Sequence, residues 1–145
     1  MYRWAEHTAE VELQIEAHSE REVFADALAA LTDLLGGPRA AGDAAPVRRT
    51  VTVPPEPVLD CPPAGPRRDR AALLAGWLEE LVFLGESEGF VATGLADADL
   101  RPDGLSATVE GVLGAPPPLV KAVTLHGLMF EPGGPGYVAR VVLDV

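Results

Sequence analysis

The sequence predicts an α+β fold in a single domain, with β-sheets covered by two principal α-helices. Two stretches, 20–35 and 69–85, place apolar residues three and four positions apart, which is the spacing of a helix with one buried face. Six other runs are β-rich and are separated by turn residues. The chain has 145 residues, which suits one domain with a substantial core. Strands outnumber helices, so we expect a sandwich in which the helices cover one face of the sheet.

The first predicted strand begins at Glu10 and alternates strictly. One face would carry Glu10, Glu12, Gln14 and Glu16, and the other Val11, Leu13, Ile15 and Ala17. This pattern is typical of an antiparallel strand with an apolar face on the core and a charged face in water. Periodicity alone therefore does not separate Glu10 from Glu12 or Glu16.

Each predicted helix has start and stop signals. Ser19 and Glu22 form a capping box before the first helix, and Gly36 and Gly37 follow its last apolar residues. The second helix is expected to begin near Asp69 and to stop around Gly85. Its apolar positions are Leu73, Leu74, Trp77, Leu78, Leu81 and Val82.

The remaining segments predict loops and strands. Residues 37–46 and 54–66 read as loops on either side of a strand at 47–53. Four further strands are expected at 89–96, 104–113, 120–130 and 137–144. The last two are separated by a strong turn signal, EPGGPG, so we expect them to pair as antiparallel neighbours.

Charge and cysteine content restrict the function. Acidic residues number 22 against 11 basic ones, a formal net charge of −11, so direct nucleic-acid binding is not expected. No apolar run reaches the roughly 20 residues that span a bilayer, and no secretory signal is evident, so we expect a cytoplasmic protein without a membrane partner. Cys61 is the single cysteine, which excludes an internal disulfide and a cysteine-built zinc site.

A few residues could carry chemistry. His7 and His126 each lie close to a threonine and a charged residue, although hydrogen bonding to a backbone carbonyl is the simpler role for each. His18 precedes the Ser19 cap and reads as a surface residue. The chain has ten arginines and a single lysine, Lys121. This lysine is either present by chance or occupies a position where the wide, planar guanidinium group of arginine could not take its place.

The C-terminal segment is apolar up to its last residue, with Asp144 one position before Val145. If this strand is paired within a sheet, several oxygen atoms would crowd at its end. Such a cluster either stays in water or recruits a hard cation. The residues alone leave both possibilities open.

Four segments in the right order resemble the archease family over nearly the whole chain. They are EHTAEVELQIEAHSEREVFADALAALTDLL, DRAALLAGWLEELVFLGESEGF, LVKAVTLHGL and ARVVLDV. The resemblance implies an archease-like sandwich fold and a non-catalytic accessory protein that activates an RtcB-type tRNA-splicing RNA ligase. Such a protein promotes metal-dependent guanylylation of the ligase, with GTP used by the partner, and multiple turnover. Some archeases resemble chaperones that modulate tRNA modification.

The resemblance also implies a divalent-metal site, with calcium preferred. Its ligands would be Glu10, Asp144 and the main-chain oxygen of Val145, while Lys121 matches a position associated with ligase activation. His7 and His126 lie in the same motifs and are further activation candidates. Glu10 stands where the family has aspartate, and calcium tolerates the longer side chain better than magnesium does. Leu125 replaces an aromatic residue of the family pattern.

Two other functions remain open. One is a metal-binding chaperone or scaffold, in which the metal would pin the C-terminal strand. The other is a stand-alone metal-dependent hydrolase or nuclease that uses Glu10, Asp144 and His7, although no dedicated general base is evident beyond one histidine.

Overall fold

The structure is a computed structural model that describes residues 1–7, 10–34, 46–53, 70–101, 104–114, 120 and 122–145. Two helices, α1 (Glu20–Leu34) and α2 (Arg70–Glu88), join seven strands. The strands are β1 (Tyr2–His7), β2 (Glu10–Ala17), β3 (Val47–Val53), β4 (Val91–Arg101), β5 (Gly104–Val112), β6 (Ala122–Gly133) and β7 (Gly136–Asp144). The predicted α+β class with two principal helices is confirmed.

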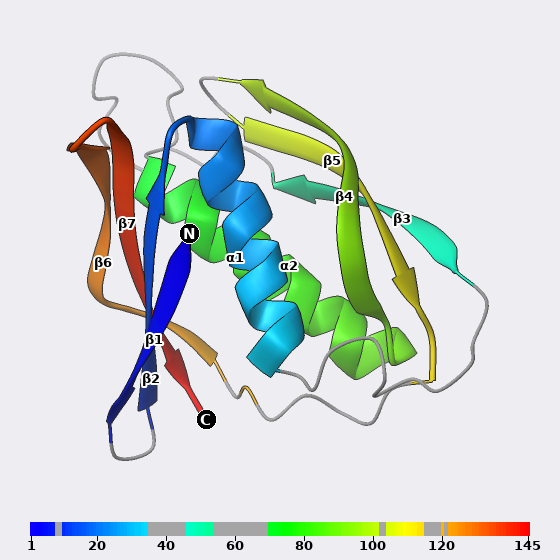
Figure 1. Cartoon of the computed structure of the whole chain (residues 1–145). Coiled ribbons are helices and arrows are strands. Elements are labelled where there is room, and N and C mark those ends of the chain that lie inside the picture. The colour runs from blue at the N-terminus through cyan, green and yellow to red at the C-terminus, as the bar shows by residue number, and fades with distance from the viewer. Residues whose placement is uncertain (8–9, 35–45, 54–69, 102–103, 115–119, 121) are drawn as a thin grey trace, which may run out of the picture.

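The strands form two antiparallel sheets, one ordered β1-β2-β7-β6 and the other β3-β5-β4. Figure 1 shows α1 and α2 lying between them, and each helix contacts strands of both sheets. The helices therefore form a middle layer, whereas the sequence led us to expect them on one face only. A helix covered from two sides buries more of its circumference than a single stripe.

Helix α1 begins at the predicted capping box. The backbone N–H of Glu22 donates to Ser19 Oγ at 3.2 Å, and the backbone N–H of His18 donates to Glu22 Oε2 at 3.0 Å. The first bond satisfies a backbone donor that the first helical turn leaves without a partner, and the second joins the helix to the residue before its cap. The glycines expected to end the helix, Gly36 and Gly37, lie outside the described residues.

Helix α2 has buried residues around most of its surface, which suits its position between the two sheets. Trp77 is fully buried, its Nε1–H donates to the Phe24 carbonyl oxygen at 3.0 Å, and the two rings meet edge to face. The helix continues three residues past Gly85 and ends before Gly89, whose φ of +67° suits a glycine at a helix end. The predicted cap at Asp69 lies outside the described residues, as do Cys61 and the predicted loops apart from Pro46.

Several strand predictions are confirmed, and two need correction. The strand at 47–53 and the antiparallel pairing of β6 with β7 are as expected, with bounds that differ by a few residues elsewhere. Strand β1 was not predicted; it pairs with β2 along its whole length. Strand β4 continues to Arg101, beyond the predicted end at 96. Two register shifts interrupt the alternation of its side chains, and this explains why the sequence pattern did not reveal its second half.

The four-stranded sheet has one face toward the helices and one away from them. Leu13, Ile15 and Ala17 of β2 are buried against the core, so the alternating set that starts at Glu10 faces outward, as predicted. Among the described residues, no helix is both long and apolar enough to cross a membrane.

Candidate functional site

The strand register brings the predicted metal ligands together at one end of the four-stranded sheet. Glu10 on β2 lies directly opposite Asp144 on β7, and both strands are interior to the sheet. On the other side of β7, Ala122 of β6 is opposite Asp144, and on β1, His7 is opposite Glu10. One row thus crosses all four strands. Figure 1 shows the C-terminus, the end of β1 and the start of β2 at this end of the sheet.

The register also fixes which way the two carboxylates point. Residues directly opposite each other in an antiparallel pair have side chains on the same face, with Cβ atoms about 4.5–5.5 Å apart. Glu10 and Asp144 therefore share the outer face, away from the helices. Val145 follows Asp144 directly and is partly buried against the core. Both carboxylates are half-buried.

Neither carboxylate has a hydrogen bond or ion pair with another described residue, and this distinguishes Glu10 from Glu12. Glu12 accepts a hydrogen bond from Gln14 Nε2 at 2.6 Å and lies 3.9 Å from Nε of Arg140. Its side chain is 18% exposed. The charge of Glu12 is thus balanced within the protein, whereas Glu10 and Asp144 face each other with no ion-pair partner among the residues that the structure describes.

The donor chemistry of this pair fits a hard divalent cation. Like charges placed directly opposite in a sheet repel, and calcium prefers carboxylate and carbonyl oxygens. Across the described residues, no three Asp, Glu, His or Cys side chains are grouped closely enough to hold a metal by themselves. The oxygens of Val145 would have to complete the protein's share, and water or a partner would supply the rest of the six to eight that calcium accepts.

The three candidate residues for ligase activation are Lys121, His7 and His126, and their side chains lie outside the described part of the structure. Lys121 lies outside the described residues, although the next residue along the chain is Ala122 in the row above. The backbone of His7 is at the end of β1, and the backbone of His126 is in β6, but neither side chain is described. His126 falls between Thr124 and Met129, where the β6–β7 register shifts.

Arg140 was not singled out from the sequence, yet it links three strands on the outer face. Besides its approach to Glu12, its Nε–H donates to the carbonyl oxygen of Gly127 at 3.1 Å. Gly127 lies in the shifted part of β6 and has a φ of +70°. The only signal for it in the sequence was an arginine at a polar position of an otherwise apolar strand. The structure places it opposite Gln14.

A groove of about 280 Å³ lies between α2 and the start of β6. Its lining residues are Glu79, Val82, Phe83, Glu86, Ala122 and Val123. The sequence offered one signal for this groove: Phe83 lies off the three-and-four spacing of the apolar stripe of α2. The groove shares Ala122 with the row of residues that crosses the sheet at the candidate metal site, because Ala122 is opposite Asp144.

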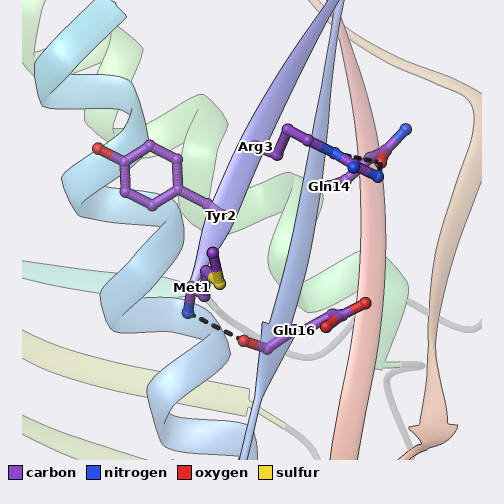
Figure 2. Close-up of a pocket in the computed structure, with 5 residues that line it drawn as sticks. All are labelled: Met1, Tyr2, Arg3, Gln14 and Glu16. Atoms are coloured by element: carbon purple, nitrogen blue, oxygen red, sulfur yellow. Dashed lines mark hydrogen bonds between the residues drawn. The ribbon is translucent and has the colours of Figure 1, made fainter.

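A separate pocket of about 150 Å³ lies at the opposite end of β1 and β2 (Figure 2). It is lined by Met1, Tyr2, Arg3, Gln14 and Glu16. The Tyr2 hydroxyl hydrogen-bonds to Asp33 of α1, while Nη2 of Arg3 donates to Gln14 Oε1 at 2.5 Å. None of the predicted site residues lines this pocket.

Comparison with known proteins gives a consistent result. A model of the Archease protein family matches residues 2–145. The chain is 30% identical to the protein archease of Archaeoglobus fulgidus over 149 aligned residues, covering 99% of this chain and 98% of that one. The archease of Pyrobaculum neutrophilum is 26% identical over 153 aligned residues, covering 99% of this chain and 95% of that one.

Two solved structures resemble the fold described above. The solution structure of protein 1598 from Methanobacterium thermoautotrophicum has a TM-score of 0.66 and 25% identity, with 99% of this chain and 98% of that chain covered. The crystal structure of an archease from Thermotoga maritima, described as a possible chaperone, has a TM-score of 0.62 and 19% identity, with 100% and 98% covered. The second likeness concerns the fold alone.

Proposed function

Because this chain belongs to the archease family, we propose that it is a non-catalytic activator of an RtcB-type RNA ligase. It would promote the metal- and GTP-dependent guanylylation of the ligase, and multiple turnover, in tRNA splicing or RNA repair. The observation that supports this most is the row across the four-stranded sheet, in which Glu10 faces Asp144 beside the chain end. Two facing, half-buried carboxylates with no ion-pair partner in the described part of the chain are suited to a cation or to a positively charged group of a partner.

Glu10, Asp144 and a main-chain oxygen of Val145 would hold a divalent ion, calcium in preference to magnesium. Calcium accepts the longer reach of Glu10 because its coordination is flexible, whereas magnesium requires near-ideal octahedral geometry. The bound ion would neutralise the facing carboxylates and offer open coordination positions to oxygen atoms of the ligase. The protein's own contribution is to fix two carboxylates on one face of a rigid sheet.

The net charge of −11 suits a partner with a basic surface. An RNA ligase needs a basic channel for its substrate, and opposite fields raise the rate of encounter over a Debye length of about 8 Å at physiological salt. Direct contact with RNA is not required. Lys121 is proposed to contact a phosphate of the partner's GTP or an acidic group near its metals, with His7 and His126 as further activation residues.

The test is ligase guanylylation and multiple-turnover ligation with and without this protein. We expect stimulation by the natural chain and its loss in Lys121→Ala, with the circular dichroism spectrum unchanged. Arg101→Ala is the matched control, because it also removes one positive charge but from an exposed side chain of the other sheet. Absence of stimulation by the natural chain under multiple-turnover conditions would contradict the proposal.

The position of β7 favours one second candidate, a metal-binding chaperone or scaffold. This strand is interior to its sheet and ends at Asp144, so a cation bound by both Asp144 and Glu10 would link the end of β7 to β2. In that case calcium would slow amide hydrogen exchange in β7 without any effect on the ligase. Metal-dependent hydrolysis by the isolated protein would instead favour the hydrolase that the sequence left open.

A further inference from the structure

Phe83 is the large apolar side chain of α2 that the core does not cover. It is 59% exposed, and within the described part of the chain only Met1 is another large apolar residue with comparable exposure. A single exposed apolar side chain is ordinary. Phe83 differs because it lines the α2–β6 groove together with the apolar side chains of Val82 and Val123.

Two carboxylates flank Phe83 on the same face of the helix. Glu79 precedes it by four residues and Glu86 follows it by three, which are the spacings that place helical side chains side by side. Seven residues of helix separate the two glutamates by about 10 Å along the axis. Both are exposed, and neither has an ion-pair partner among the residues described here.

The groove and the candidate metal site share one position of the edge strand β6. Ala122 lines the groove and is exposed, and in the β6–β7 register it is directly opposite Asp144. The groove therefore lies at the same end of the sheet as the candidate metal site. Its apolar and acidic side chains are on or next to α2, whereas the two carboxylates of the metal site are on the outer face.

We propose that the α2–β6 groove docks a basic segment of the partner protein, with an apolar side chain set against Phe83 and Lys or Arg residues facing Glu79 and Glu86. The charge pattern selects this occupant, because an acidic or neutral segment would leave the two carboxylates unpaired at a buried interface. Resting on the proposed function, the partner is the RNA ligase. The groove supplies affinity, and the metal site and its neighbours supply activation.

The experiment is calorimetric titration of the RtcB-type ligase of the same organism with the natural chain and with two variants. Phe83→Ala is expected to raise Kd by about tenfold or more, as truncation of a central aromatic anchor does. Glu79→Gln/Glu86→Gln is expected to raise Kd and to flatten its dependence on salt. Ligase stimulation at saturating protein should stay unchanged in both variants, because Glu10 and Asp144 are intact.

Glu16→Gln/Glu131→Gln is the matched control. It removes the same charge from two exposed carboxylates that lie outside the groove and have no ion-pair partner among the described residues. We expect its Kd and salt dependence to equal those of the natural chain. An equal effect of the two double variants would mean that only overall charge matters, which overturns the groove as the docking site.

The remaining outcomes separate this inference from the proposed function. If the natural chain stimulates the ligase and Phe83→Ala leaves Kd unchanged, the docking proposal is wrong while the function stands. Binding that depends on Phe83 without any stimulation supports docking and refutes activation. If the natural chain does not bind the ligase, or if it dimerises and Phe83→Ala makes it monomeric, the groove has another occupant and the proposal is overturned.

Discussion

Replacing Glu10 by glutamine is expected to change stability in opposite directions without and with calcium. Glu10 and Asp144 face each other on one side of the sheet, with no compensating partner among the described residues. Like charges directly opposite in a sheet cost about 0.2–1 kcal/mol, so Glu10→Gln should stabilise the metal-free protein by that amount. For a chain of 145 residues this corresponds to a rise in Tm of about 1–4 °C.

In calcium, the natural chain should have a higher Tm than the Glu10→Gln variant, the reverse of their order without metal. A ligand present at 100 times its Kd stabilises the folded state by about 2.7 kcal/mol, or about 10 °C in Tm for a protein of this size. Calcium should stabilise the natural chain by this amount. It should stabilise the Glu10→Gln variant much less, because one of the two carboxylates that would hold the ion is gone. Thermal unfolding followed by circular dichroism, in chelator and in calcium, measures both effects.

Glu12→Gln is the matched control on the same strand and the same face. Glu12 accepts a bond from Gln14 and lies near Arg140, so removing its charge should destabilise the protein by about 0.5 kcal/mol with and without calcium. The shift produced by calcium should remain that of the natural chain. The reasoning is refuted if Glu10→Gln lowers Tm in chelator and leaves the calcium shift unchanged.

Two further predictions concern the core. Trp77→Phe should lower the free energy of unfolding in urea by about 2–4 kcal/mol, because it removes the buried hydrogen bond from the indole N–H to the Phe24 carbonyl and opens a cavity; a loss below about 1 kcal/mol would contradict this. Gly111→Ala should cost about 1–3 kcal/mol, because its Cβ would clash with the carbonyl oxygen of Val91 and would lie 2.5 Å from the ring of Phe90. Gly94→Ala, with nothing within 4 Å of its Cβ, should be nearly neutral, and equal losses at the two glycines would refute the steric argument.

Local patterns predicted most elements of this fold. The capping box at Ser19 and the alternation after Glu10 act within one element, so α1 and β2 could be identified without knowledge of the rest of the chain. Strand β1 was missed because a six-residue edge strand is defined mainly by its pairing with β2. Strand β4 ran longer than expected because its bulges remove the alternation on which the prediction depended.

The residues of the candidate site, and the pairing of Glu10 with Asp144 across the sheet, were predicted from the family resemblance, whereas the order and register of the strands were not. The resemblance to a family pointed to Glu10, Asp144 and Val145, while periodicity treated Glu10 and Glu12 alike. The structure separates the two by their neighbours: Glu12 has Gln14 and Arg140, and Glu10 has Asp144. The α2–β6 groove was missed because it joins a helix to a strand some 40 residues further along the chain.

The sequence by itself determined most of the segments that become helices and strands, which of their faces are apolar, and how acidic the protein is. These properties depend on residues near one another in the chain. Only the tertiary structure decided that both helices lie between two sheets, and that β7 enters between β2 and β6 so that Glu10 faces Asp144. Strand order and register follow from packing over long sequence separations, where each strand needs a partner for its backbone and each apolar face needs cover.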